Sequence, residues 1–309
     1  MTFICKSASR REFIAGALGT AAGVCALGAL NPSKGFAADA PAKGAVKLRL
    51  GLATYQWGMD WDIPTLIANL KKADVLGVEL RTSSKYAHGV ELEIAAQRRS
   101  EVKKQYADSP VKIVSVACGE RMDWPEAEKL KASIEASKGY LKLSSDIGST
   151  CVRVFPNQFW PNVEHEKTIA QIAKAVNELG AYAADLGQRV DLEAHGPAGE
   201  LTTMKAVMDQ VTQKSVGIRL NCDNRDAAGK GFEENFNLVK DFLAHTIHIH
   251  NLKNEKFPYQ QQANLLVKMG WDGWLLMENS EKVPDRIEAM IEQRKIWEGI
   301  VEKALKAQG

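Results

Sequence analysis

Four residues with metal-binding side chains stand at or near the ends of four β-branched runs in the second half of the sequence: Glu193, Asn221, His248 and Glu278. Two carboxylates, an imidazole and an amide oxygen form a ligand set suited to Mn²⁺, Co²⁺ or Zn²⁺. A lone glutamate at such a position is often only a salt-bridge partner. That explanation is less satisfactory for two glutamates with a histidine between them. The pattern predicts one divalent metal ion, with Mn²⁺ as first choice and Co²⁺, Zn²⁺ or Mg²⁺ as alternatives.

Further ionisable residues alternate with apolar ones in the same runs. If the last polar residue of each run points inward, the inward side carries Glu79, Arg81, Arg153, Asp191, Glu193, His195, Arg219, Asn221, His248, His250 and Glu278. Burying each of these groups costs several kcal/mol unless it is paired or binds a metal. The inward side therefore indicates a site rather than a purely apolar core. We expect Asp191 and Arg219 to form a buried ion pair one layer beneath that site.

Five further residues are candidates for substrate contact. His195 and His250 each follow a proposed ligand by two residues, so either could touch substrate, bind the metal or support a ligand. Arg153 could donate to substrate oxygens or form a structural ion pair. Trp57 could be an apolar wall for a substrate ring, and His88 lies in a polar loop that could reach the substrate. For the last two, ordinary packing and solvation are the alternatives.

These residues need a scaffold that brings many strand ends together. After residue 46 the chain alternates β-branched runs with amphipathic helical stretches. Strands are predicted at 48–54, 77–81, 111–117, 150–155, 190–195, 216–221, 246–250 and 274–278, and helices near 63–75, 93–106, 125–147, 163–186, 200–213, 232–243, 257–269 and 283–306. Pro64 and Pro125 near helix starts, and Gly148 and Gly187 after helix ends, support these bounds.

Eight strand–helix units in strict alternation predict an α/β fold, a parallel (β/α)8 TIM barrel over residues 47–309. Such a barrel typically takes ~250 residues and carries its active site at the carboxyl ends of its strands. An open doubly wound sheet is the alternative. That fold rarely has so many units without a Gly-rich phosphate loop after its first strand, and the segment 53–57 (ATYQW) contains no glycine.

Residues 1–40 have the features of a cleavable twin-arginine export signal, followed by a linker at 41–46. Arg10 and Arg11 precede an Ala/Gly/Leu-rich stretch, and Ala38-Asp39-Ala40 offers small residues for cleavage. A core or membrane helix is the alternative, but the stretch is short and weakly hydrophobic. We therefore expect a periplasmic or secreted protein with no stable membrane insertion after processing.

Charge and cysteine content exclude several kinds of partner. The net charge of the whole chain is +2, and residues 1–40 contribute four positive and two negative side chains, so the remainder is close to neutral. No nucleic acid partner is predicted. The cysteines outside the signal, Cys118, Cys151 and Cys222, are too few for a disulfide framework. We expect a small-molecule partner and leave a homo-oligomer open.

Three segments resemble the xylose isomerase-like TIM-barrel family, which includes ketose 3-epimerases, hydroxypyruvate isomerases, inosose dehydratases and endonuclease IV-type enzymes. They are LEAHG at 192–196, IHIHN at 247–251 and GWDGW at 270–274 with the glutamate at 278. In the family, the strand-5 glutamate, the first strand-7 histidine and the strand-8 glutamate bind metal. The resemblance covers about residues 47–306 and implies that Glu193, His248 and Glu278 are ligands.

The sequence departs from the family at strand 6. The family ligand there is usually aspartate, and the matching position is Asn221, whose amide oxygen can ligate but carries no charge. Asp223 could take its place if the strand ends early. The additional His and Asp ligands of the endonuclease IV type are not evident, which argues against a nuclease.

The resemblance implies a metal-dependent sugar isomerase or epimerase that abstracts a proton next to a carbonyl and passes through an enediolate. Glu193 and Glu278 are then ligands that double as the acid/base pair. Export favours an unphosphorylated sugar or keto-sugar, because sugar phosphates are cytoplasmic. The alternatives are a 3-keto-glycoside lyase or hydratase, since the same proton abstraction can end in elimination, and a sugar-binding barrel that has lost catalysis through Asn221.

Overall fold

The computed structural model describes residues 46–83 and 85–308. The predicted signal, 1–40, and nearly all of the predicted linker lie outside the described residues. The strands are β1 Leu48–Ala53, β2 Gly77–Arg81, β3 Lys112–Arg121, β4 Cys151–Phe155, β5 Arg189–Glu193, β6 Val216–Arg219, β7 Thr246–Ile249 and β8 Gly273–Met277. The helices are α1 Ile63–Ala73, α2 Ala96–Ala107, α3 Ala127–Ile147, α4 His165–Asp185, α5 Leu201–Met208, α6 Phe232–Val239, α7 Tyr259–Lys268 and α8 Arg286–Lys306.

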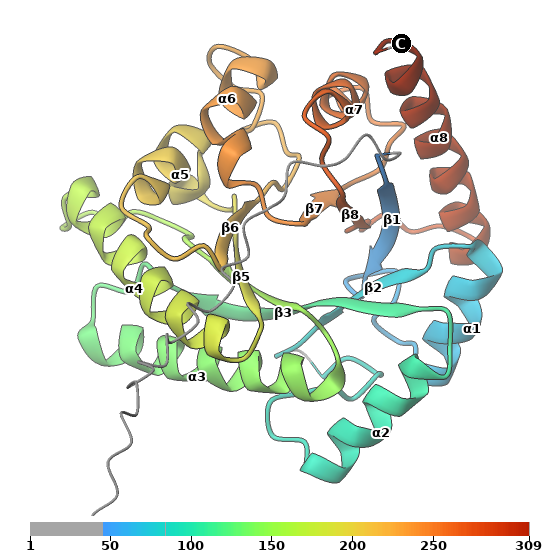
Figure 1. Cartoon of the computed structure of the whole chain (residues 1–309), viewed down its shortest axis with the longest axis horizontal. Coiled ribbons are helices and arrows are strands. Elements are labelled where there is room, and N and C mark those ends of the chain that lie inside the picture. The colour runs from blue at the N-terminus through green and yellow to red at the C-terminus, as the bar shows by residue number, and fades with distance from the viewer. Residues whose placement is uncertain (1–45, 84, 309) are drawn as a thin grey trace, which may run out of the picture. The chain divides into compact units, whose positions relative to one another are not determined.

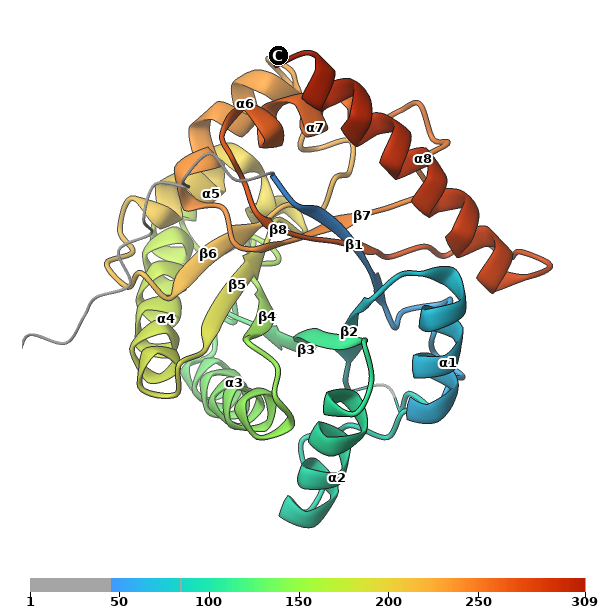
Figure 2. The same ribbon diagram turned by 45° about the vertical axis from the view of Figure 1, so that its right-hand side comes forward.

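The strands form one parallel sheet in the order β6-β5-β4-β3-β2-β1-β8-β7. The open edge between β6 and β7 is nearly closed by two backbone hydrogen bonds, from Ala244 to Ile218 at 2.7 Å and from His248 to Leu220 at 2.9 Å. The helices surround the strands (Figures 1 and 2). The predicted (β/α)8 barrel is therefore confirmed.

Local sequence explains where several helices begin and end. The Asp62 side chain accepts a hydrogen bond from Thr65 N–H at 2.9 Å and caps α1, and Asp285 caps α8 in the same way. Gly148 ends α3 with a φ of 84°, a conformation that glycine adopts without strain. The predicted helix at 200–213 stops earlier, at Met208, and the predicted strand at 111–117 runs on to Arg121, which pairs with Phe155 of β4.

The apolar core lies between strands and helices and contains residues such as Leu52, Leu70, Val116, Leu179 and Ile247, all fully buried. Within the described part of the chain, no helix combines the length and the apolar character needed to cross a membrane.

Candidate metal centre and active site

The carboxyl ends of β5, β7 and β8 bring three potential ligands together. One ligand atom each from Glu193, His248 and Glu278 lies within 4.8 Å of the other two. Nδ1 of His248 is 3.2 Å from Oε2 of Glu193 and 3.4 Å from Oε2 of Glu278. The side chains of His248 and Glu193 are 0% and 2% exposed, and that of Glu278 is 12% exposed. Glu278 is thus the member of the set that solvent can reach.

Three buried polar atoms of the proposed ligands form no hydrogen bond with the described residues. They are Oδ1 of Asn221, and Oε2 of Glu193 and Nδ1 of His248, which have charged groups within 3.4 Å but none in hydrogen-bond geometry. The Asn221 amide nitrogen donates to Asp223 at 3.5 Å, which leaves its oxygen free. An unsatisfied buried polar atom costs about 1–3 kcal/mol. A bound divalent ion would remove that cost, so the donor set fits such an ion.

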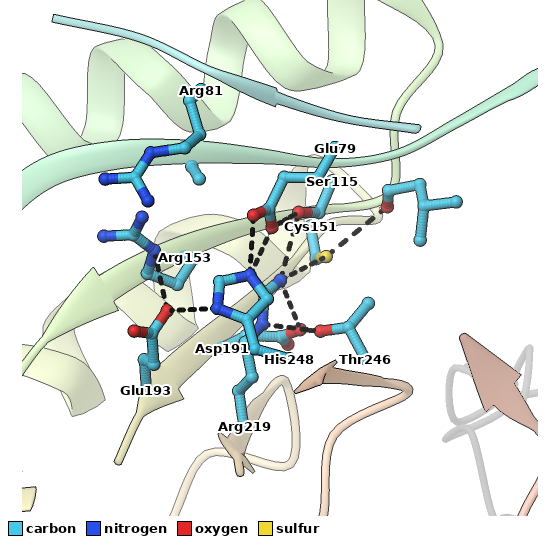
Figure 3. A network of polar contacts seen from close by, with 12 residues as sticks. Glu79, Arg81, Ser115, Cys151, Arg153, Asp191, Glu193, Arg219, Thr246 and His248 are labelled. Carbon is cyan, nitrogen blue, oxygen red and sulfur yellow. Dashed lines mark hydrogen bonds and ion pairs between the residues drawn. The ribbon is translucent and has the colours of Figure 1, made fainter. Parts of the chain in front are cut away.

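Glu79 of β2 determines which nitrogen of His248 faces the other ligands. Nε2 of His248 lies 2.7 Å from Oε1 of Glu79, so the Nε2–H donates to the carboxylate and Nδ1 points to Glu193 (Figure 3). Metal-binding histidines usually donate their second N–H to a carboxylate in this way, which fixes the ring. Burial opposes ionisation of Glu79, but the charges of Arg219 and His248 outweigh it and hold its pKa well below the usual range.

Each of the two candidate ligand carboxylates also meets an arginine. Nε of Arg153 is 3.0 Å from Oε2 of Glu193, and Arg81 pairs with Oε1 of Glu278. Burial opposes ionisation of Glu278, but the charges of His248 and Arg81 outweigh it and lower the pKa of Glu278 to about 2. Burial likewise opposes protonation of His248, but the surrounding carboxylates, Glu278 foremost, raise its pKa to about 9. The carboxylates therefore favour a positive charge at the position of His248.

Beneath the ligands lies a second polar layer, centred on Arg219 of β6. Arg219 is 0% exposed and pairs with Glu79, and its Nη2 is 3.3 Å from Oδ2 of Asp191. Its Nε donates to Thr246 at 2.7 Å and its Nη2 to Ser115 at 3.0 Å (Figure 3). The predicted buried pair of Asp191 and Arg219 is present, and Glu79 extends it to the ligand layer above.

Arg153 and His195 contact the same aromatic ring at the end of β4. The Arg153 guanidinium lies 3.9 Å from the ring centre of Phe155, and the His195 ring is 4.8 Å from it. Nδ1 of His195 is 3.2 Å from the Asn157 side-chain amide. A Cβ on Gly196 would lie 1.9 Å from the Asn157 carbonyl oxygen, so glycine is required at this position. The loops after β4 and β5 therefore pack directly against each other. Burial lowers the pKa of His195.

His250 and Trp57 both contact the segment that follows β8. Nδ1 of His250 is 3.3 Å from the carbonyl oxygen of Glu278. The Trp57 indole N–H donates to the Glu281 carbonyl oxygen at 2.9 Å, and its ring is 3% exposed within the core. Trp57 is therefore a core residue that holds the segment after β8, and the expected apolar wall for a substrate ring is not present at this position.

His88 lies inside the protein rather than in a solvated loop. It is 1% exposed, its Nδ1 accepts from the Val90 N–H at 3.1 Å, and its Nε2 is 3.4 Å from the Thr54 hydroxyl. Burial lowers the pKa of His88 to about 4. The side chain anchors the loop after β2 to the end of β1.

Asp223, the alternative strand-6 ligand, pairs with the Arg225 side chain and accepts from the Arg225 N–H at 2.8 Å. The turn passes through Cys222 with a φ of 55°. These contacts occupy the Asp223 carboxylate and leave the Asn221 oxygen as the unpartnered strand-6 acceptor.

Sequence reasoning placed Glu79 and Arg81 on the inward side of β2 but gave neither a role at the site. The alternation of side chains along the strand could have indicated such a role, because it puts both residues on the inward side, where the proposed ligands of other strands lie. Their partners could not be found from spacing, since Glu79 and His248 are 169 positions apart and Arg81 and Glu278 are 197 apart.

Comparison with known proteins agrees with this architecture. The family model described as "Xylose isomerase-like TIM barrel" matches residues 67–298. No curated protein matches significantly. Among solved structures, the chain is similar to 3-keto-D-glucoside 4-epimerase from E. coli, with a TM-score of 0.69 and 13% identity over 82% of this chain and 100% of that one. It is also similar to L-ribulose 3-epimerase (TM-score 0.70, 13% identity, 85% and 97% covered) and to the IOLI protein with a binding zinc atom (0.69, 14%, 83% and 99%).

Proposed function

Since the chain belongs to the xylose isomerase-like TIM-barrel family, we propose that it is a metal-dependent sugar isomerase or epimerase. It abstracts a proton next to the carbonyl of an unphosphorylated sugar or keto-sugar and passes through an enediolate. The observation that carries this proposal is the cluster of Glu193, His248 and Glu278, whose ligand atoms lie within 4.8 Å of one another. The names of two structural neighbours, a keto-glucoside epimerase and a ribulose epimerase, support the same class of reaction.

We propose that Glu193, His248, Glu278 and the Asn221 amide oxygen hold the ion, with Mn²⁺ as first choice. A bound divalent ion supplies Lewis-acid polarisation of the substrate carbonyl and stabilises the negative charge of the enediolate. His248 serves as a neutral ligand through Nδ1, because its Nε2–H is taken by Glu79.

Glu193 and Glu278 are proposed as the groups that move the proton. They come from β5 and β8 and lie on either side of His248 of β7, so a substrate between them meets one carboxylate on each face. An epimerase needs that arrangement, since the proton leaves one face and returns to the other. Arg153 and Arg81 position the carboxylates, and Arg81, 21% exposed, can also donate to substrate oxygens.

The charges around the site favour a neutral substrate. Four arginines lie in, at the end of, or after four different strands, and each is paired with a carboxylate: Arg81, Arg121, Arg153 and Arg225. Guanidinium–carboxylate pairs offer both donors and acceptors to sugar hydroxyls while adding no net charge. A phosphate would instead favour unpaired cations.

An uncharged substrate agrees with the proposed twin-arginine export. Replacement of Arg10 and Arg11 by Lys tests that export: we expect unprocessed precursor in the cytoplasm, and efficient export of the variant would contradict the assignment.

A lyase is the second candidate, favoured by the two histidines that follow the ligand positions. His195 is held through Nδ1 by Asn157, and His250 through Nδ1 by the Glu278 carbonyl. With Nδ1 of His195 accepting from the Asn157 amide nitrogen, its Nε2–H can donate to a leaving group. His250, whose Nδ1–H donates to the Glu278 carbonyl oxygen, can donate through Nε2 only when its ring is protonated. Isomer and elimination products differ in composition by the lost group, so mass spectrometry separates the two reactions.

Solvent exchange tests the proposed function most directly. Mn²⁺-loaded protein is incubated in D₂O with a panel of free sugars and keto-glycosides, and the carbon next to the carbonyl is followed by NMR. We expect deuterium incorporation with at least one sugar, lost in Glu193→Gln and Glu278→Gln. Binding of sugars without exchange in any of them would indicate the sugar-binding barrel instead.

A further inference from the structure

Two tryptophans at the mouth of the barrel are not used by the proposed reaction. Trp124 lies in the loop after β3 and Trp160 in the loop after β4, on the side of the barrel that carries the metal ligands. Both are half-buried, and their ring centres are 5.8 Å apart. Other described tryptophans, such as Trp57 and Trp297, are buried in the apolar core. Trp124 and Trp160 do not belong to that core.

Polar anchors hold these rings at intermediate exposure. Asp123 is 1% exposed, accepts from the Trp160 indole N–H at 3.1 Å, and accepts from Nε of Arg121 at 3.0 Å. The Arg121 guanidinium lies 4.3 Å from the ring centre of Trp124. Gln171 of α4 donates to the Trp124 carbonyl oxygen at 3.0 Å. We refer to Trp124, Trp160 and Arg121 as the aromatic shelf, a surface whose geometry is set before any ligand arrives.

The shelf is connected to the candidate active site by direct contacts. With the Asn157 amide nitrogen facing His195, the amide oxygen accepts from Nη2 of Arg121 at 2.8 Å. His195 contacts Phe155, which in turn lies against Arg153, the partner of Glu193. The shelf therefore borders the substrate side of β4 and β5.

The chemistry of the shelf suits a neutral ring. Asp123 pairs with Arg121, and Glu126 pairs with Lys129, whose ammonium lies 5.1 Å from the ring centre of Trp124. Neither cation is therefore left for a phosphate or carboxylate, while polar atoms remain for hydroxyl groups. Half-exposed tryptophans present apolar area to the C–H-rich face of a sugar ring or to an aryl ring. Binding sites commonly combine aromatic walls with a few fixed polar groups of this kind.

We propose that the aromatic shelf binds the second ring of the substrate, so that the substrate is a glycoside rather than a free monosaccharide. This inference rests on the proposed function, because it takes the ring that reacts to lie between Glu193 and Glu278. The second ring, joined by the glycosidic bond, then packs on Trp160 and Trp124.

The test compares two substrates in each protein. Turnover of a methyl keto-glycoside, which has no second ring, is measured beside that of the matching keto-disaccharide and phenyl keto-glycoside. We expect wild-type protein to prefer the two-ring compounds, and Trp124→Ala and Trp160→Ala each to lower that preference roughly 3- to 10-fold, the range of a lost aromatic contact. Because the preference is a ratio within one preparation, partial unfolding of a variant cancels.

Trp274→Ala is the matched control. Trp274 also contacts an arginine, Arg49 at 5.0 Å, but it lies on β8 and packs against Gly77. We expect its preference to remain that of wild type. An unchanged preference in both shelf variants would overturn the proposal. If no compound is turned over, the proposed function fails, and the same ratio measured for binding by calorimetry still decides whether the shelf holds a second ring.

Discussion

The inside of the barrel contains two polar layers that differ in how completely their groups are paired. In the lower layer, Arg219 contacts Glu79, Asp191, Ser115 and Thr246, so its charge and most of its donors are satisfied by the protein. In the upper layer, buried atoms of Glu193, Asn221 and His248 are without a hydrogen-bond partner among the described residues. Among the residues of the lower layer, only Oδ1 of Asp191 lacks a hydrogen bond, whereas the upper layer has three such atoms, as expected of a site that a bound ion completes.

This difference separates stability from function. A buried charge that loses its partner destabilises a fold strongly, so the lower layer must stay intact. Unsatisfied groups persist where a ligand completes them, and they mark functional sites. Glu79 belongs to both layers, since one oxygen meets Arg219 and the other meets His248. Substitutions in one layer, or at the link between them, are therefore expected to have different effects.

The largest expected effect is on catalysis in the upper layer. Glu193→Gln and Glu278→Gln keep the shape and an oxygen ligand but remove the basic carboxylate. Loss of a positioned acid or base typically lowers the rate ~10²–10⁴-fold. Steady-state turnover of the metal-loaded variants measures this. Near wild-type turnover in either variant would remove that glutamate from the reaction.

The next largest effect is on stability in the lower layer. Arg219→Met preserves much of the side-chain volume but leaves the carboxylates of Glu79 and Asp191 buried without their cation. Breaking a buried pair in this way costs about 3–5 kcal/mol of unfolding free energy. Denaturant unfolding measures the loss, with Arg81→Met as the control, because the Arg81 pair is partly exposed. Equal losses in the two variants would show that the layers do not differ as described.

Glu79→Gln tests the link between the layers. The amide cannot hold the His248 ring as a carboxylate does, so we expect metal affinity to fall about 10–100-fold, as is usual when a ligand's supporting carboxylate is removed. Competition with a fluorescent chelator measures the affinity. Asp191→Asn is the control, because Asp191 pairs with Arg219 and Thr246. An unchanged affinity in Glu79→Gln would mean that His248 does not need this partner.

The smallest effect is expected at strand 6. If the Asn221 oxygen is a ligand, Asn221→Asp adds a negative charge to the site and should tighten metal binding by roughly tenfold, since affinity rises with the charge of the ligands. Asp223→Asn serves as the control and should leave affinity unchanged, because its carboxylate is engaged by Arg225. Should the control weaken binding while Asn221→Asp has no effect, Asp223 would be the strand-6 ligand.

Periodicity and turn residues were sufficient to predict the barrel, because each strand and helix carries its own pattern. The rule that side chains alternate across a strand also placed Glu193, His248 and Glu278 on one side of the sheet. The sequence predicted the pair of Asp191 and Arg219, which stand on adjacent strands. It could not reveal pairs across the barrel, such as Arg219 with Glu79, because these partners meet only after the sheet closes. Nor could it show that His88 folds into the interior, since the polar loop around it has no periodic pattern to follow.

Metal content tests the central claim most directly, because every catalytic role assigned above depends on a cation in the upper layer. Purified wild-type protein, His248→Ala and Asp191→Asn are dialysed against Mn²⁺ and then against metal-free buffer, and bound metal is measured by elemental analysis. We predict about one divalent ion per chain in wild type and in Asp191→Asn, and little in His248→Ala. Full occupancy in His248→Ala, or no retained metal in wild type, would contradict it.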